Sequence, residues 1–254
     1  MTETKIIKLL LEHGRKEYAK ERQDVIAYSN DDDCNRLTDD LENYPHAFVI
    51  GCVIDRMMRT ELAWEIPYRL KERIGSFEFE DLHQMEEHEL CKHFNHPHPL
   101  HRYHGTMPKY VHSAIQIIGK KYDGDASKIW SDTPSSGTVV YRFLQIHGVG
   151  PKIATMATNL LVRDFKIKLK DHYSIDVSAD THVKRVLRRL ELTEENASSE
   201  QIIYRARGLH PEFPGLLDYP CWRIGKDWCT PRNPLCDQCY MQEVCPTAEE
   251  IRKR

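Results

Sequence analysis

Four cysteines near the end of the chain have the spacing of metal ligands. Gaps of six, two and five residues separate Cys229, Cys236, Cys239 and Cys245. Structural zinc sites are usually built from two Cys-x2-Cys pairs, whereas here one such pair is flanked by single cysteines. A [4Fe–4S] cluster has an iron at four corners of a cube, so single cysteines can approach it from different sides. The spacing therefore predicts an iron–sulfur site, with zinc or unligated buried cysteines as the alternatives.

A second chemical feature is a glycine-rich segment, residues 144–152, between two helical patterns. Its two glycines permit a tight turn and the close approach of another backbone. Pro151 can begin the following helix, whose free N–H groups would form a site for an anion such as a DNA phosphate. The segment therefore predicts a phosphate-binding hairpin, and an ordinary helix–helix turn is the alternative. Its candidate DNA-binding residues are His147, Gly148, Val149 and Gly150.

A third feature is the segment 179–190, which has an apolar stripe and a basic face. Lys184 and Arg185 lie on the basic face, where they are candidates for contact with phosphate or belong to a simply solvated surface. Asp180 stands where a helix N-cap is expected, since its side chain can accept the first free N–H groups of the helix. Local sequence alone favours capping over catalysis for Asp180.

Composition narrows the class of protein. The 254 residues are 40% hydrophobic, which is ample for a core, and the formal net charge of −3 slightly disfavours a nucleic-acid partner without excluding a local basic face. No apolar run approaches the roughly 20 residues that span a bilayer, and no secretory leader is recognisable. We therefore expect an intracellular, cytoplasmic protein with no membrane contact, in which the scattered cysteines do not form a disulfide framework.

The elements that must position these residues are helices. Period-two alternation is almost absent, and its lone candidate is the short segment 165–169. Apolar spacing instead predicts helices over seven stretches, namely 5–27, 55–73, 109–122, 138–146, 151–162, 180–190 and 199–209. The sequence therefore predicts an all-α fold.

Together the three motifs resemble endonuclease III and the wider helix-hairpin-helix family of base-excision DNA glycosylases. The hairpin from His147 to Lys152 is similar to the family's Gly-Val-Gly-x-Lys element. The segment Ala179-Asp180-Thr181-His182 is similar to its Val-Asp-Thr-His element, and the four cysteines match its cluster spacing. The resemblance extends from about residue 103 to residue 245 and is faint upstream.

This resemblance implies two helical lobes with DNA lying across the groove between them. One lobe would be a helical barrel over residues 42–160, ending in the hairpin. The other would combine residues 1–41 with residues 161–254 and carry the [4Fe–4S] cluster. The implied partner is double-stranded DNA with a damaged base or an abasic site, and the protein is expected to be a monomer.

The resemblance also implies a reaction. Lys152 would attack the anomeric carbon of the sugar and form a Schiff base, and Asp180 would stabilise the developing positive charge or help deprotonate the lysine. The enzyme would thus remove a base and cleave the abasic site by β-elimination. Two alternatives stay open: a monofunctional glycosylase that acts on an alkylated or otherwise modified base, and a non-catalytic DNA-binding iron–sulfur protein.

Two segments depart from the family pattern. The family's early helix usually supplies a polar wedge that fills the gap left by the flipped base. Residues 55–60 instead offer Met57 or Met58, with Arg56 or Arg59 to contact phosphate or the orphan base. The alternative is that the methionines fill the core. Five histidines crowd one loop, where we expect surface residues and keep a metal site as the alternative: His93, His96, His98, His101 and His104. The damaged base itself is not predicted.

Overall fold

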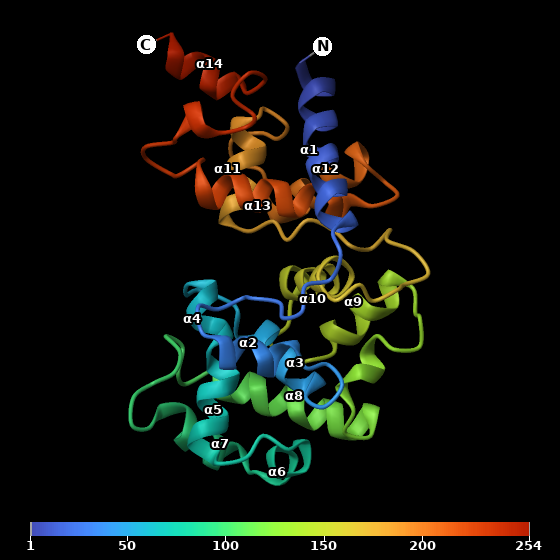
Figure 1. Cartoon of the computed structure of the whole chain (residues 1–254), viewed down its shortest axis with the longest axis vertical. Coiled ribbons are helices and arrows are strands. Elements are labelled where there is room, and N and C mark those ends of the chain that lie inside the picture. Colours follow the sequence, from blue (N-terminus) through green and yellow to red (C-terminus); the bar gives the residue numbers. More distant parts are fainter. Residues whose placement is uncertain (1, 254) are drawn as a thin grey trace.

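The protein is helical throughout the part that the structure, a computed structural model, describes, which is residues 2–253. No strand occurs in that range, so the all-α prediction is confirmed. The short segment 165–169, the lone candidate for period-two alternation, forms a loop in which Lys166 has φ 59°. Two lobes lie one above the other in Figure 1.

The lower lobe in Figure 1 is built around α3 (Pro45–Ile54), which is buried at every position because its sequence is apolar on all sides. Helices α8, α2 and α10 pack against it. The elements of this lobe are α2 (Asp32–Asp39), α3, α4 (Thr60–Trp64), α5 (Ile66–Ile74), α6 (Phe79–Gln84), α7 (Glu87–Asn95), α8 (Met107–Tyr122), η1 (Ala126–Ile129), α9 (Ser136–Leu144) and α10 (Pro151–Arg163).

The upper lobe joins the two ends of the chain. Helix α1 packs against α13 and η2 and contributes Ile6, Leu10 and Leu11 to the core of this lobe. Its elements are α1 (Thr2–Ala19), α11 (Thr181–Arg189), α12 (Ser199–Leu209), η2 (Pro214–Leu217), α13 (Asp218–Asp227), η3 (Cys236–Gln238) and α14 (Pro246–Arg252).

The first predicted helix differs from the structure in two respects. It ends at Ala19 rather than at residue 27, and Gly14 does not interrupt it. A Cβ at Gly14 would lie 2.1 Å from the carbonyl oxygen of Leu216, so the glycine is where α1 comes closest to η2. Its role is a close backbone contact within the upper lobe.

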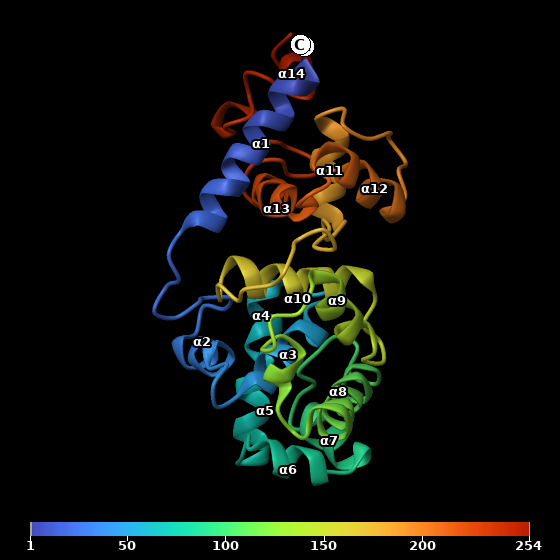
Figure 2. The ribbon, with the colours of Figure 1, turned by 90° about the vertical axis from the view of Figure 1, so that its right-hand side faces the viewer.

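The lobe boundary also differs from the predicted one at residue 42. Ile26 and Leu37 belong to the core of the lower lobe, and Phe165 closes that core at the other end. The chain therefore leaves the upper lobe directly after α1, and α2 lies in the lower lobe, as Figure 2 shows. The amphipathic pattern of α2 indicates a buried face but not the lobe that buries it.

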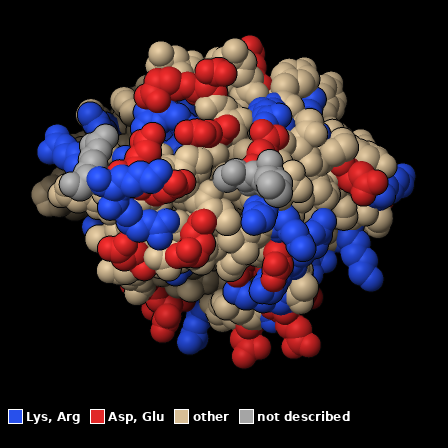
Figure 3. Space-filling view, turned by 90° about the horizontal axis from the view of Figure 1, so that it is seen from above, with Lys and Arg blue, Asp and Glu red and all other residues tan. Residues whose placement is uncertain are grey.

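Charge on the upper end of the molecule is mixed. Lys, Arg, Asp and Glu side chains alternate over the face in Figure 3, so this end presents no extended area of one sign. None of the helices described between residues 2 and 253 is both long and apolar enough to cross a membrane.

Candidate functional site

The hairpin between α9 and α10 has the geometry that its glycines require. Gly148 has φ +82°, and a Cβ there would lie 2.5 Å from the ring of Tyr110. His147 is exposed and packs edge-on against the same ring, while Val149 is buried. Gly150 is the N-cap of α10 and would have no atom within 4 Å of a Cβ. The N-terminus of α10 is therefore open to a ligand that approaches over Gly150.

Asp180 caps α11. Its Oδ1 accepts the backbone N–H groups of His182 and Val183, both at 2.8 Å. The positive φ of the preceding residue, Ala179 at +40°, turns the chain into this cap. Val183 and its stripe are buried against the upper lobe, as the periodicity predicts. The cap uses only Oδ1, so Oδ2 remains available for other contacts.

The two candidate basic residues of α11 have different surroundings. Arg185 donates from Nε to the carbonyl oxygen of Cys229 and from Nη2 to that of Gly225, at 2.6 and 2.8 Å. These bonds join α11 to α13 and to the cysteine loop, so the guanidinium is occupied within the protein. Lys184 instead lines the groove between the lobes. Of the two, Lys184 is the better placed for a DNA phosphate.

The loop between α3 and α4, residues 55–59, carries the wedge candidates. Met57 is 62% exposed and has φ 57°, so it is held out into solvent on a strained backbone. This exposure argues against a core-filling role for Met57. Arg56 points inward and donates from Nη1 to the carbonyl oxygen of Gly148 at 2.7 Å, which ties the loop to the hairpin.

One histidine of the His-rich loop is not a surface residue. His101 is 2% exposed, and its Nε2 donates to the carbonyl oxygen of Arg56 while its Nδ1 accepts the N–H of Tyr103. The expectation that all five histidines lie on the surface is therefore wrong for His101. Its ring thus holds the backbone of the wedge loop, residues 55–59, at Arg56.

The lobes enclose a groove with a smaller cavity at its floor. The interlobe groove has a volume of about 940 Å³ and includes Met57, Lys184 and Lys226 in its walls. The inner cavity, of about 120 Å³, extends between the lobes. Lys152 and Asp180 line both spaces, so the structure brings together the two predicted catalytic residues from α10 and α11. The inner cavity is lined by Tyr28, Asp55, Thr60, Trp64, Lys152, Met156, Leu160, Arg163, Ser178, Asp180, Asp218 and Trp222.

Sequence reasoning missed a third residue beside this pair, the acid Asp55. Asp55 follows α3 and accepts the Nε1–H of Trp64 at 3.2 Å and the hydroxyl of Thr60 at 3.4 Å. Burial raises the pKa of Asp55, and the charge of Lys152 opposes that rise. The sequence signal for Asp55 is that this charged residue directly follows an apolar segment, residues 47–54. Three further cavity residues, Arg163, Asp218 and Trp222, carry no motif that could have marked them.

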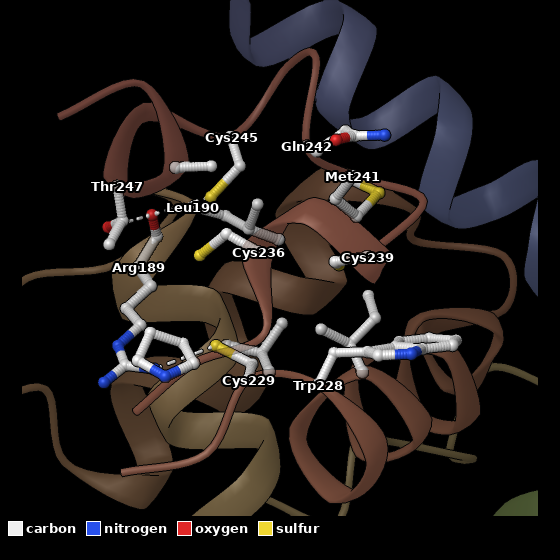
Figure 4. Close-up of a pocket in the computed structure, with 14 residues that line it drawn as sticks. Arg189, Leu190, Trp228, Cys229, Cys236, Cys239, Met241, Gln242, Cys245 and Thr247 are labelled. Carbon is white, nitrogen blue, oxygen red and sulfur yellow. Dashed lines mark hydrogen bonds between the residues drawn. The ribbon is translucent and has the colours of Figure 1, made fainter. Parts of the chain in front are cut away.

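The four cysteines line one cavity in the upper lobe, shown in Figure 4. Within residues 2–253 no three Cys, His, Asp or Glu side chains lie close enough to share a single ion. The cysteines instead surround a space whose other walls include Val186, Leu190, Ile224 and Ala248. Nη1 of Arg189 donates to Sγ of Cys229 at 3.2 Å, which joins the end of α11 to the cysteine loop. Four sulfur donors around one largely apolar space fit a [4Fe–4S] cluster.

These features define a class of protein: two helical lobes, a helix-hairpin-helix at their junction and a four-cysteine loop. Residues 50–212 match the model of the HhH-GPD superfamily of base excision DNA repair proteins, and the chain belongs to that superfamily. Residues 229–245 match the iron–sulfur binding domain of endonuclease III. The four cysteines are therefore the ligands expected for a [4Fe–4S] cluster, which when bound would cross-link the segment 229–245.

Sequence relatives agree with this assignment. Endonuclease III-like protein 1 of Gallus gallus is 27% identical over 145 residues, which cover 56% of this chain and 45% of that protein. Endonuclease III of a Synechocystis strain is 27% identical over 149 residues, covering 56% of each. The chain thus matches roughly half the length of these curated relatives.

Solved structures show the same fold. A trapped covalent intermediate of endonuclease III with DNA has a TM-score of 0.65 at 16% identity and covers 100% of this chain and 99% of its own. A thermostable thymine-DNA glycosylase has a TM-score of 0.64 at 15% identity, with 98% and 100% covered. The endonuclease III-like fold predicted from the motifs is confirmed.

Proposed function

We propose that this protein is a base-excision DNA glycosylase that also cleaves the abasic site through a Schiff base on Lys152. The observation that carries the proposal is the meeting of Lys152 and Asp180 in the inner cavity. Lys152 is exposed at the second position of α10, directly after the open glycine of the hairpin. A phosphate bound at this helix N-terminus would place the neighbouring sugar close to the lysine.

The reaction uses few groups. The base leaves C1′ with the bonding electron pair and takes up a proton, while the neutral amine of Lys152 bonds to C1′. Opening of the sugar ring gives the Schiff base, loss of a C2′ proton expels the 3′ phosphate, and water then releases the lysine. The free Oδ2 of Asp180 would stabilise the positive charge that develops on the sugar. Its Oδ1 is held by two N–H groups, so the side chain has little freedom to move.

The groove would hold a DNA duplex from both lobes. A base inside a duplex must leave the stack before Lys152 can reach its sugar, and a side chain then fills the gap. Met57 is suited to this role because it lines the interlobe groove. The backbone beside it is held in place, since Arg56 is hydrogen-bonded to the hairpin and to His101. Lys184 and the N-terminus of α10 would neutralise phosphates.

Borohydride trapping tests the proposal. Wild-type protein should become covalently linked to a duplex with an abasic site, and Lys152→Gln should lose the link because an amide cannot form a Schiff base. Lys120→Gln is the matched control, since Lys120 is exposed at the end of α8, outside the groove. If Lys152→Gln still traps, another amine is the nucleophile. If wild type releases a base without trapping, the monofunctional alternative takes the place of this proposal.

Asp180→Asn separates capping from chemistry. Asparagine caps a helix as well as aspartate does, so thermal stability should stay near that of wild type. The loss of the negative charge should slow base release by a factor of about 100 or more, within the range seen when a single electrostatic group is removed. Equal base release by both proteins would leave Asp180 with the cap as its only role.

A further inference from the structure

The inner cavity has an acidic wall that Lys152 and Asp180 do not explain. Asp218, the first residue of α13, is only 7% exposed and lines the cavity. Its Oδ1 accepts the N–H of Ser178 at 2.5 Å, and Oδ2 has no hydrogen-bond partner among residues 2–253. The hydroxyl of Ser178, which also lines the cavity, is buried without a partner. The carboxylate and the hydroxyl thus give this wall polar groups that can bind a polar ligand.

A donor stands near this acceptor. Arg163, at the end of α10, is held by Asp164 through Nε and Nη2, both at 2.7 Å, and lies over the ring of Tyr219. Within the described residues its Nη1 makes no hydrogen bond, although Arg163 lines the cavity. Burial raises the pKa of the Asp218 carboxyl, and the charge of Arg163 opposes that rise. The same cavity therefore offers a fixed donor, Arg163, and a carboxylate, Asp218.

Flat rings complete the cavity. Trp222 is one helical turn beyond Asp218 on α13, so both residues face the same side of that helix. From the lower lobe, Tyr28 and Trp64 line the cavity with ring centroids 4.2 Å apart. Aromatic faces on both lobes suit a flat base, since stacking on aromatic rings holds any base without reading its edge. The identity of the base would then be recognised through hydrogen bonds from its edge to Asp218 and Arg163.

We propose that the inner cavity selects a guanine-type base by its Watson–Crick edge, with Asp218 accepting and Arg163 donating. This rests on the proposed function, because the base must be flipped into the cavity. Guanine presents a carbonyl oxygen, a ring N–H and an amino group in a row, so Arg163 can bond the oxygen while the carboxylate accepts from the two nitrogens. Asp218 and Arg163 are thus specificity-determining residues.

Other bases fit this wall less well. The edge of a thymine-type base has one N–H between two carbonyl oxygens, so one oxygen of the carboxylate would face an acceptor. Adenine and cytosine place a ring acceptor beside their single amino group, which again opposes the carboxylate. Because a buried polar group left unpaired strongly disfavours the wrong ligand, these mismatches should produce a large difference in rate. The guanine edge is shared by guanine and by guanine oxidised on its five-membered ring, so the proposal commits to that class.

The test compares three duplexes, which contain 8-oxoguanine, thymine glycol or an abasic site. Base release from each lesion is divided by the yield of borohydride trapping on abasic DNA, a step that needs Lys152 but no base. Wild type should release 8-oxoguanine at least tenfold faster than thymine glycol. Asp218→Asn, which replaces the carboxylate by an amide, should lower the ratio for 8-oxoguanine at least tenfold and the ratio for thymine glycol much less. The matched control, Asp32→Asn, removes an exposed carboxylate on α2, outside the cavity, and should change neither ratio.

A binding assay keeps the proposal separate from the chemistry. In the Lys152→Gln background, affinity for the 8-oxoguanine duplex should exceed affinity for the thymine glycol duplex, and Asp218→Asn should remove this preference. Absence of trapping by wild type would refute the lysine mechanism while the binding arm still tests recognition. Normal trapping with thymine glycol preferred, with no release of 8-oxoguanine, or with unchanged selectivity in Asp218→Asn would overturn the recognition by Asp218 and leave the proposed function intact.

Discussion

The hairpin makes a sharp prediction about stability at Gly148. Its φ of +82° lies in the left-handed region, where an L side chain costs about 1–2 kcal/mol. A Cβ would also lie 2.5 Å from the ring of Tyr110, and forcing an extra carbon into a packed site costs about 1–3 kcal/mol. We therefore expect Gly148→Ala to lower the free energy of unfolding by about 2–5 kcal/mol.

Two other variants separate these contributions. Gly150→Ala, two residues away, has φ −100° and no neighbour within 4 Å, so it should change stability by only a few tenths of a kcal/mol. Adding Gly148→Ala to a Tyr110→Ala protein should cost only the backbone part, about 1–2 kcal/mol, because the ring is gone. The difference between the two backgrounds measures the clash.

Urea unfolding followed by far-UV circular dichroism gives the required free energies, provided that the cluster absorbance is the same in all variants. If Gly148→Ala is as stable as Gly150→Ala, the left-handed turn and its packing on Tyr110 are not what holds the hairpin. If the full loss persists without the Tyr110 ring, the backbone alone explains it and the packing argument fails.

Four further variants have measurable consequences, at Gly150 of the hairpin, Met57 of the wedge loop, Cys236 of the cluster site and the buried Asp218. Gly150→Val should weaken binding to undamaged duplex without lowering the melting temperature, and wild-type binding should fall steeply with salt; salt-independent binding would count against a phosphate site. Met57→Ala should reduce base flipping, read by 2-aminopurine fluorescence, while Met57→Gly, which relieves the φ of 57°, should be at least as stable as wild type. Cys236→Ser should remove the broad visible absorption and most of the roughly four irons per chain, whereas a colourless protein with one zinc would refute the cluster. Burial raises the pKa of Asp218 from 3.8 to about 6, so the folded state binds this proton more tightly than the unfolded chain, and stability falls as pH rises through that window. Asp218→Asn should therefore stabilise the protein by up to about 3 kcal/mol at pH 7.5 and hardly at all at pH 4, and an equal effect at both pH values would contradict the assigned cause.

Much of the site could be predicted because its signals are local. The spacing of the cysteines, the glycines at 148 and 150 and the cap at Asp180 are each set within a few residues, and the structure has them as expected. The helical spacing of apolar residues was equally informative, since it predicts the positions of α8, α10, α11 and α12 correctly. The position of α2, which contributes Leu37 to the core of the lower lobe, was not predictable. The apolar pattern of a helix defines its buried face but does not identify the helices that cover that face.

The polar wall of the cavity was beyond sequence reasoning for a related reason. Arg163 and Asp218 come from α10 and α13, and neither has a spacing that links it to the other. Each alone reads as an ordinary charged residue at a helix end, where such side chains are favoured by the helix dipole. His101 was expected on the surface because it belongs to a histidine-rich loop that Pro97 and Pro99 keep irregular. In each case the chemistry arises from tertiary contact between segments distant in sequence.

Helix α11 connects the cluster to the reaction site. Asp180 caps its N-terminus at the cavity, while Arg189 in its last turn donates to Sγ of Cys229 and to the carbonyl oxygens of Thr230 and Pro231. Nine helical residues span only about 13 Å, so a shift at one end of α11 is carried to the other as a rigid movement. Binding of the cluster would order the segment 229–245 and thereby fix both Arg189 and the helix. Through Arg189 and Asp180, α11 thus links the cysteine loop to the cavity between the lobes.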